Sequence, residues 1–181
     1  MSLQNRLTEK FGIEHPIVLA PMDYVSDWRL ASAVAEAGGL GLIGGGYGDE
    51  SWLHDQFDRV TTEAVGCGFI TWSMAQQPQL LEKAIGYRPA AIFLSFSDPA
   101  PHAPAIRAAG IPLICQVHNL EQARRAVAVG ANVIAAQGGR GGRSWNRNPI
   151  DVHPGAGDRR LSRAGGPGGN AAGSRWNRRR P

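Results

Sequence analysis

Six short apolar runs, each followed by an amphipathic stretch except the last, divide residues 16–137 into a regular alternation. The runs are unbroken rather than alternating with polar residues, which is typical of strands that are covered on both faces of a parallel sheet. One helical stretch between consecutive runs supplies the crossover that parallel strands require. The pattern predicts an α/β protein, and it fits both a closed (β/α)8 barrel and an open doubly wound sheet.

The positions of the runs and of the helical periods define the expected elements. We expect strands at residues 16–20, 40–43, 65–71, 90–96, 112–117 and 132–137, and helices at 27–37, 50–64, 77–85, 101–109 and 120–129. Gly38 and Gly130 follow two of these helices, where a glycine favours helix termination. Because a complete barrel has eight units and about 250 residues, six β/α units in 181 residues predict an incomplete barrel.

The composition changes abruptly after Gln137. Residues 1–137 contain 9 Lys and Arg against 13 Asp and Glu, whereas residues 138–181 contain 10 Arg against 2 Asp. The last part also holds 11 of the 24 glycines and has no apolar period of either a strand or a helix. We therefore predict two parts, a partial barrel at residues 1–139 and a disordered Arg/Gly-rich tail at residues 140–181.

Several function classes are disfavoured by the sequence. The amino-terminal residues carry no basic segment followed by a long apolar stretch, as a signal peptide would. No apolar run approaches the length of about 20 residues that crosses a bilayer. Cys67 and Cys115 lie inside apolar runs, so we expect buried thiols rather than a disulfide or metal ligands. These features predict a cytoplasmic protein with no membrane partner and no metal site.

In a parallel β/α barrel, chemistry is located at the carboxyl ends of the strands. The segments expected there are 20–22, 44–46, 71–73, 116–118 and 137–139. Taken alone, such short Gly- and Pro-containing segments are typical of turns and loops. By the same reasoning His118 is better interpreted as a hydrogen-bonding residue at the barrel mouth than as a base.

Four segments in a fixed order carry a more specific signal. They read FGIEHPIVLAPM, LASAVAEAGGLGLIGGG, VGCGFITW and AAGIPLICQVHNLEQARRAVAVGANVIAAQGG. From about Leu7 to Gly139, this order and spacing resemble the nitronate monooxygenase (2-nitropropane dioxygenase) family. The resemblance implies a TIM barrel that holds FMN at its mouth. It also implies oxidation of nitronates or nitroalkanes, with O2, to a carbonyl compound and nitrite.

The resemblance further implies a set of cofactor-binding residues within or directly after three of the expected strands. They are Ala20, Pro21, Met22, Gly68, Gln137, Gly138 and Gly139. In the family, the backbone of the first segment lies against the flavin ring, and relatives often carry Asn at the position of Gly68. The last three residues begin the family motif QGxEAGGH, in which the glutamine contacts the flavin and the glycines approach its phosphate.

The motif does not continue in this chain. Residues 140–145 read RGGRSW, so the histidine that acts as catalytic base in the family is absent and no catalytic residue is assigned. The codons CGA GGC GGG CGG TCA TGG encode RGGRSW, and one base later they encode EAGGHG. Residues 148–161 and 176–181 can likewise encode family-like segments in that same frame. We therefore predict a frameshift near Gly139 and an enzyme that is impaired by loss of its carboxyl-terminal part.

Two alternatives remain open. A related FMN-dependent enoyl reductase would share the barrel and most of the motifs but would use a nicotinamide donor. A non-catalytic fragment could instead use its basic tail to bind the phosphates of nucleic acids. Because a shifted frame in a GC-rich gene explains the arginines without such a role, we expect a small-molecule substrate and no nucleic-acid partner.

Overall fold

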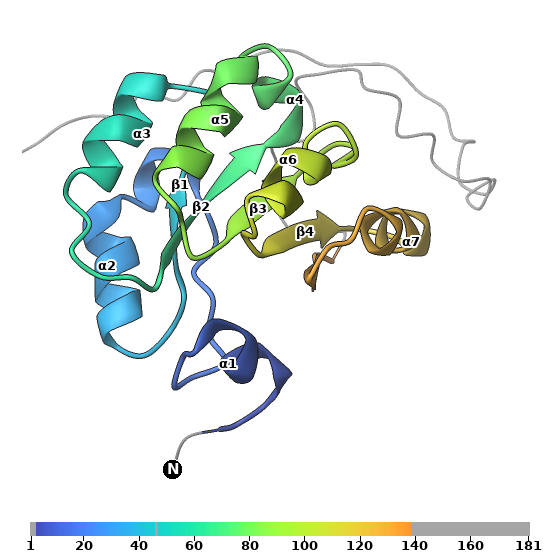
Figure 1. Cartoon of the computed structure of the whole chain (residues 1–181). Helices are drawn as coiled ribbons and strands as arrows, with labels where there is room; N and C mark the ends of the chain where they lie inside the picture. Colours follow the sequence, from blue (N-terminus) through green and yellow to red (C-terminus); the bar gives the residue numbers. More distant parts are fainter. Residues whose placement is uncertain (1–2, 46, 139–181) are drawn as a thin grey trace, which may run out of the picture. The chain divides into compact units, whose positions relative to one another are not determined.

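The computed structural model describes residues 3–45 and 47–138, which form a parallel sheet covered by helices (Figure 1). Five strands lie in the order β1-β2-β3-β4-β5: Gly41–Gly44, Val65–Ile70, Ile92–Ser95, Leu113–Val117 and Val133–Ala136. Each strand pairs in parallel with the one that precedes it in the chain. This order builds up as in a barrel and lacks the reversal of a doubly wound sheet. The predicted incomplete TIM barrel is therefore confirmed.

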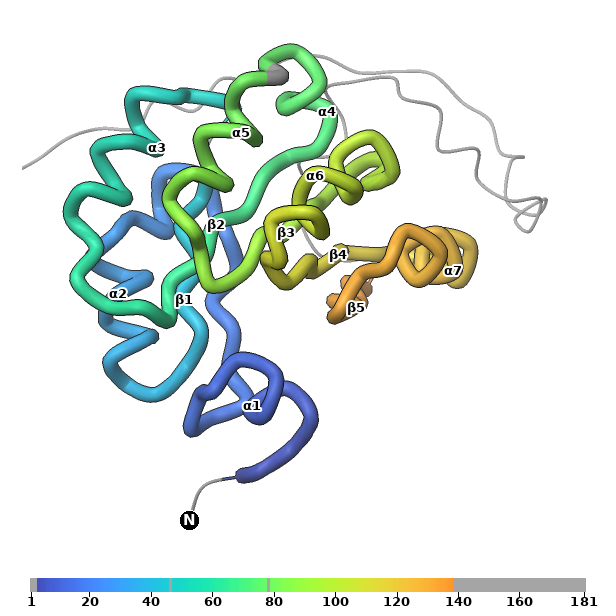
Figure 2. The backbone as a smooth tube through the Cα atoms, viewed as in Figure 1, coloured from blue at the N-terminus to red at the C-terminus, as the bar shows by residue number. Residues whose placement is uncertain are grey.

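Apart from the first helix, which precedes all strands in the chain, the helices lie along one side of the sheet. They are α1 Arg6–Phe11, α2 Trp28–Glu36, α3 Glu50–Phe57, α4 Thr71–Met74, α5 Pro78–Gly86, α6 Ala103–Ala108 and α7 Leu120–Ala128, with a 3-10 turn η1 at Asp23–Val25. Figures 1 and 2 show the crossover helices following the sheet from α2 to α7, with α1 at the end opposite α4. Among the described residues, no helix is both long and apolar enough to cross a membrane.

Local sequence signals set the limits of several helices. Asp27, Asp49 and Asn119 precede α2, α3 and α7, and each side chain accepts a hydrogen bond from a backbone N–H of the first turn. Such caps each contribute about 1 kcal/mol. Gly38 and Gly130 follow α2 and α7 with φ of +85°, a backbone conformation that favours glycine. The expected ends of these two helices are confirmed.

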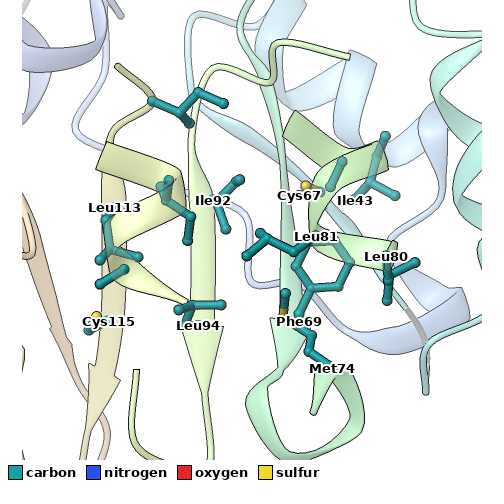
Figure 3. Packing of buried hydrophobic residues seen from close by; sticks show 14 of the residues in the cluster. Ile43, Cys67, Phe69, Met74, Leu80, Leu81, Ile92, Leu94, Leu113 and Cys115 are labelled. Atoms are coloured by element: carbon teal, nitrogen blue, oxygen red, sulfur yellow. The ribbon is translucent and has the colours of Figure 1, made fainter. Parts of the chain in front are cut away.

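The main hydrophobic core lies between the helices and the sheet (Figure 3). Alternate strand residues point toward the helices, among them Ile43, Cys67, Ile92, Leu94 and Leu113, each at most 2% exposed. Cys67 and Cys115 are both buried and free, as the apolar context of the two cysteines predicts. This face holds most of the buried apolar side chains and is the principal source of stability.

The opposite face of the sheet has a smaller core. Leu42, Phe93 and Ile114 form it together with Leu40 and Ile13. Several neighbouring positions on this face are glycines, so few side chains fill the space in front of β1 and β2. In a barrel this is the face that turns toward the interior.

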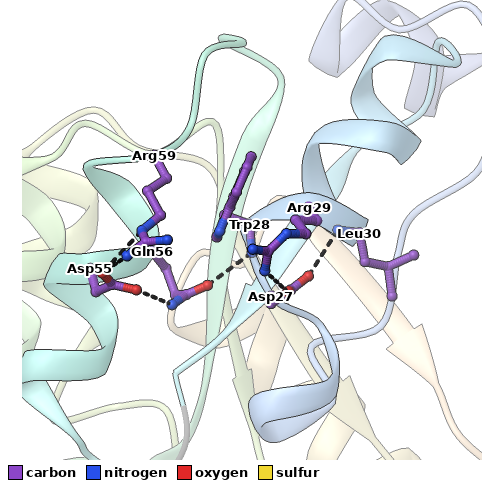
Figure 4. A network of polar contacts seen from close by, with 7 residues as sticks. All are labelled: Asp27, Trp28, Arg29, Leu30, Asp55, Gln56 and Arg59. Atoms are coloured by element: carbon purple, nitrogen blue, oxygen red, sulfur yellow. Dashed lines mark hydrogen bonds and ion pairs between the residues drawn. The ribbon is translucent and has the colours of Figure 1, made fainter.

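A polar network joins the start of α2 to α3 (Figure 4). Gln56, only 2% exposed, accepts a hydrogen bond from the Trp28 N–H at 3.0 Å and donates one to Asp55 at 3.1 Å. Arg59 binds the same Asp55 carboxylate. The network fixes the first turn of α2, and with it the chain that leaves the segment at residues 20–22.

The first expected strand, at residues 16–20, is not formed. Val18 alone pairs with Leu40 as a parallel bridge, through hydrogen bonds of 2.9 Å from Leu19 N–H to the Leu40 carbonyl and from Leu40 N–H to the Ile17 carbonyl. Proline lacks an N–H group, and Pro16 and Pro21 bound this segment. Pro21 has no N–H for the next ladder bond, and the Ile17 N–H donates to the His15 carbonyl at 2.7 Å. The described residues therefore form a sheet of five strands and a bridge instead of six strands.

Three further local expectations need correction or completion. The expected strand end at residues 71–73 belongs to the short helix α4, and the helix expected at 50–64 ends at Phe57. The chain turns there, and Val60 packs with Phe57 against the core. The sequence pattern did not predict α1, although Asn5 and Thr8 form a reciprocal capping box at its start. The expected tail at residues 140–181 lies outside the described residues.

Candidate flavin site at the strand ends

Because all strands run in the same direction, their carboxyl ends meet along one edge of the sheet. This edge brings together the segment at residues 20–22, Gly44 at the end of β1, and the residues that follow β4 and β5. The structure thus collects most of the residues that the sequence singles out into one region. Of the expected cofactor-binding residues, Gly139 lies outside the described part of the chain.

The segment at residues 20–22 is anchored through Ser26. The Met22 N–H donates to the Ser26 hydroxyl at 2.6 Å, and the Ser26 carbonyl accepts from the Gly44 N–H at 2.9 Å. Ser26 is fully buried, whereas Ala20 is exposed and Met22 is 42% exposed. The backbone is therefore held against β1, while the side chains of Ala20 and Met22 are exposed.

Asp23, which follows the segment at residues 20–22, explains why β1 ends in a glycine, Gly44. A Cβ atom on Gly44 would lie 2.0 Å from the carbonyl oxygen of Asp23. Asp23 itself has a φ of +49°, which is uncommon for a residue other than glycine. Burial raises the pKa of the Asp23 carboxyl, while a hydrogen bond from the backbone of Tyr24 opposes the shift. The close approach of two backbones fixes the turn that starts at Met22.

Gly68 is buried beneath Pro21. A Cβ atom on Gly68 would lie 2.3 Å from Cγ of Pro21 and 3.2 Å from Cβ of Phe93. A side chain at this position therefore has no room unless Pro21 moves. The glycine lets the chain at residues 20–22 approach the interior face of β2, so its contribution to the site is made through Pro21.

Three polar side chains converge where β4 and β5 end. The Gln116 amide nitrogen donates to the Gln137 side-chain oxygen and lies 3.4 Å from Nε2 of His118. The Gln137 N–H donates to the Val117 carbonyl at 2.9 Å, which extends the ladder between the two strands. Sequence reasoning named Gln137 as a site residue and placed Gln116 at a strand end without assigning it a role. Its alternation with Ile114 and His118 on one face of β4 is the signal that could have identified it.

His118 contacts residues of three neighbouring segments. Its backbone N–H donates to the Gln122 side chain at 2.8 Å, and its ring stacks on Phe96 with centroids 6.0 Å apart. Phe96 follows β3 with a φ of +60°, and strained backbone of this kind tends to cluster at functional sites. Burial lowers the pKa of His118, and a hydrogen bond to the backbone of Gln137 opposes this shift. Burial therefore favours the neutral form of the imidazole.

Aromatic residues line the other end of the same edge. Tyr24 packs edge-on against Trp52 with centroids 4.8 Å apart, and Tyr47 lies 6.1 Å from Trp72. The Trp52 indole N–H donates to the Gly44 carbonyl at 2.9 Å. The tyrosines are about half exposed, at 48% and 53%. They give the region around Met22 an apolar border.

These groups fit the ring system of a flavin. Exposed Ala20 and Met22 offer apolar surface to a flat ring, and the Gln116 and Gln137 amides offer both donors and acceptors to its polar edge. Gly138 is exposed, and a Cβ atom there would meet nothing within 4 Å. The described residues thus provide apolar and hydrogen-bonding groups of the kind that a flavin ring requires.

Comparison with known proteins points in the same direction. Residues 4–65 match the family model for nitronate monooxygenase. A Mycobacterium tuberculosis (strain ATCC 25618 / H37Rv) protein named (3aS,4S,5R,7aS)-5-hydroxy-7a-methyl-1-oxo-octahydro-1H-indene-4-carboxyl-CoA dehydrogenase is 34% identical over 147 residues, 78% of this chain and 41% of that protein. A probable nitronate monooxygenase of Staphylococcus aureus (strain NCTC 8325 / PS 47) is 42% identical over 57 residues, 32% of this chain and 16% of that protein.

Solved structures agree with the fold. FabK from Thermotoga maritima matches with a TM-score of 0.69 and 26% identity, over 75% of this chain and 44% of that chain. Nitroalkane oxidase from Streptomyces ansochromogenes matches with a TM-score of 0.58 and 25% identity, over 72% of this chain and 48% of that chain. The chain spans less than half the length of these relatives. Over residues 4–65 the chain matches the nitronate monooxygenase family, and its described part has the parallel strand order of a TIM barrel.

Proposed function

We propose that the protein is a flavin-dependent oxidoreductase that uses FMN and O2 to convert nitronates or nitroalkanes to a carbonyl compound and nitrite. The observation that carries this proposal is the meeting of two features at one edge of the sheet. These are the anchored segment at residues 20–22 and the Gln116–Gln137 amide pair. Both occur in a chain whose sequence and fold match nitronate monooxygenases and a nitroalkane oxidase.

The chain's own residues would bind and orient the cofactor and the substrate. Met22 would lie against the ring, and the Gln116 and Gln137 amides would hydrogen-bond its polar edge. Bound FMN supplies the electron acceptor and the reaction with O2. The half-buried aromatic border around Met22 would limit the access of water to a substrate on the ring.

We propose that the 181-residue chain on its own is an impaired enzyme. In the family motif a histidine follows β5, but Arg143, Ser144 and Trp145 stand at that point of this sequence. None of the three is a base near neutral pH in the way that imidazole is. A nitronate is already deprotonated, so its oxidation needs no base, and we expect nitronates to be better substrates than neutral nitroalkanes.

Flavin binding tests the site directly. The full chain is titrated with FMN, and flavin fluorescence reports binding for the natural sequence, for Met22→Glu and for Met22→Leu as a matched control. A carboxylate against the ring should weaken binding about tenfold, or 1.4 kcal/mol, whereas leucine should preserve it. Equal affinity of all three proteins would place the flavin elsewhere. Nitrite release from propyl-2-nitronate then tests the reaction.

A second candidate is the reduction or dehydrogenation of an acyl thioester, as in an FMN-dependent enoyl reductase. It is favoured by the M. tuberculosis relative, a carboxyl-CoA dehydrogenase whose match spans 147 residues, and it is compatible with the FabK likeness. The two activities separate in paired assays of the same FMN-loaded protein. Nitrite release without NADH oxidation supports the first candidate, and thioester-dependent NADH oxidation without nitrite supports the second.

We also propose that residues 140–181 arise from a shifted reading frame. The support is the codon argument for the motif EAGGHG and the concentration of arginine in that part of the sequence. Resequencing the gene tests the idea, because an intact single frame through the codon of Gly139 contradicts it. A basic tail that binds nucleic acid would instead give salt-dependent retention on RNA or DNA that is lost when residues 140–181 are deleted.

A further inference from the structure

We propose that the open edge of the partial barrel, formed by β5 and the adjacent flank of α7, pairs with the same edge of a second copy of the chain. This inference concerns assembly and does not depend on the proposed function. It starts from three large apolar side chains that remain exposed at this edge. Leu120 and Val127 on α7 are each 64% exposed, and Ile134 on β5 is 38% exposed.

The two exposed residues of α7 lie on the flank of the helix that faces away from α6. Because an α-helix has about 3.6 residues per turn, Leu120 and Val127 occupy the same side of α7. Ala126 is 1% exposed and marks the side that packs on the sheet. Arg125 marks the flank toward α6, since it binds Asp98 in the loop between β3 and α6. Leu120 and Val127 therefore lie on the other flank, on the side of β5, the last strand of the described sheet (Figure 2).

The strand β5 continues this apolar surface on the helix side of the sheet. Ile134 and Ala136 pair in register with Cys115 and Val117, which belong to the core between the sheet and the helices. Both residues of β5 are nevertheless exposed. Among the described residues β5 pairs with β4 alone, so its outer edge offers backbone N–H and C=O groups to another strand. The open edge thus combines an apolar stripe with an unpaired strand.

A second copy fits this surface because the surface is complementary to itself. Two identical edge strands can pair antiparallel about a two-fold axis perpendicular to the sheet, which keeps both helix layers on the same side. Because α7 connects β4 to β5, the two α7 helices would then run antiparallel about two strand spacings apart. Two spacings are roughly 10 Å, the distance between packed helices. In this arrangement Leu120 of each copy lies opposite Val127 of the other.

The charges beside the apolar stripe also match between two copies. Glu121 and Arg124 are exposed, and neither forms an ion pair with a described residue. Between antiparallel helices, Arg124 of each copy is displaced from Glu121 of the other by about 4.5 Å along the helix axis. Two ion pairs can therefore form across the rim of the interface.

The remaining residues of the chain do not match the open edge. Residues 139–181 have no helical or strand period and are rich in arginine and glycine. They offer no apolar stripe to cover Leu120, Val127 and Ile134. A second copy offers both the apolar stripe and the strand edge, and is therefore the occupant that we assign.

Sedimentation of the full chain tests this assembly. Between about 1 and 100 μM we expect a monomer–dimer equilibrium that persists in high salt, because the interface is mainly apolar. Leu120→Asp and Val127→Asp should each raise the dissociation constant about 100-fold, since the two-fold axis removes two apolar contacts for each substitution. Ile17→Asp is the matched control, because Ile17 is 59% exposed but lies at the opposite edge of the sheet, beside Leu40.

Reversing the rim charges tests the antiparallel arrangement. Arg124→Glu should weaken the dimer about tenfold, because it places like charges across the rim, and adding Glu121→Arg to it should restore the dimer. A chain that stays monomeric overturns the proposal, as does assembly beyond a dimer, an equal loss in Ile17→Asp, or a charge reversal that restores nothing. Circular dichroism checks folding, and Leu120→Asn or Val127→Asn replaces an aspartate variant that does not fold.

Discussion

The strands β3 and β5 have similar apolar sequences but very different surroundings. All four residues of β3 are buried, whereas β5 alternates between half-buried and exposed residues. Ile92 on β3 is 0% exposed and Ile134 on β5 is 38% exposed, although both lie on the helix side of the sheet. β3 pairs with strands on both sides, while among the described residues β5 pairs with β4 alone. An apolar sequence predicts that a strand is buried, but the elements packed around the strand determine how much of it is buried.

This difference bears on the site. Gln137, which follows β5, depends for its position on contacts with β4, namely the Val117 carbonyl and the Gln116 amide. Gly44 and Gly68, by contrast, are packed tightly into the chain around them. One half of the candidate site is therefore built into the stable part of the sheet, and the other half is attached to its least covered strand.

The largest effect expected from this comparison concerns the two isoleucines. Ile92→Ala should lower the free energy of unfolding by about 4 kcal/mol, because it leaves a cavity in the fully buried core. Ile134→Ala should cost only about 1 kcal/mol, since part of that side chain already contacts water. Urea unfolding followed by circular dichroism measures both. Equal losses would show that β5 is as well packed as β3.

Two glycines give the next largest contrast. Gly68→Ala should destabilise the protein by about 1–3 kcal/mol, because the new Cβ collides with the ring of Pro21. Gly138→Ala should change stability by less than about 0.5 kcal/mol, since its Cβ would meet nothing within 4 Å. The same unfolding assay compares the two variants. A stable Gly68→Ala protein would mean that Pro21 is not held against β2.

The two buried thiols can report local unfolding at two places in the sheet, one next to β5 and one farther from it. Burial raises the pKa of Cys115 to about 11 and that of Cys67 further still, so neither reacts readily in the folded protein. Cys115 lies on β4 next to the edge strand, whereas Cys67 lies on β2. We expect Cys115 to be alkylated about tenfold faster than Cys67, because a strand beside the poorly covered β5 unfolds locally at a lower free-energy cost. Timed labelling and peptide mass mapping distinguish the sites, and equal rates would indicate opening of the whole sheet.

The smallest effect involves the ion pair that ties the loop after β3 to α7. Hydrogen bonds from Arg125 hold the pKa of the Asp98 carboxyl below its usual value of 3.8. A carboxyl whose pKa is depressed by folding adds stability above pH 3.8 and loses it as the pH falls through the folded-state value. Both side chains are about half exposed, so the contribution is small. The loss of stability between pH 6 and pH 3, measured from unfolding curves, should be slightly larger for the natural protein than for Asp98→Asn.

Much of the architecture follows from local sequence signals. Unbroken apolar runs predicted the parallel strands β1 to β5, and Gly38 and Gly130 marked the ends of two helices. The same signals failed at residues 16–20, where an apolar run forms a single bridge because Pro21 lacks an N–H and the Ile17 N–H donates to the His15 carbonyl instead. They also missed α1, whose short amphipathic stretch is stabilised mainly by its cap.

What the sequence determined by itself is the alternation of parallel strands and helices, and therefore which segments end at the same edge of the sheet. Hydrophobic periodicity and helix-capping residues are local signals that span a few residues, so they can be recognised in the sequence without knowledge of the fold. Only the tertiary structure placed Pro21 over Gly68 and brought Gln116 to Gln137 and to the ring of His118. These contacts depend on strand register and on the volumes of side chains that are far apart in the sequence. No local pattern encodes such contacts.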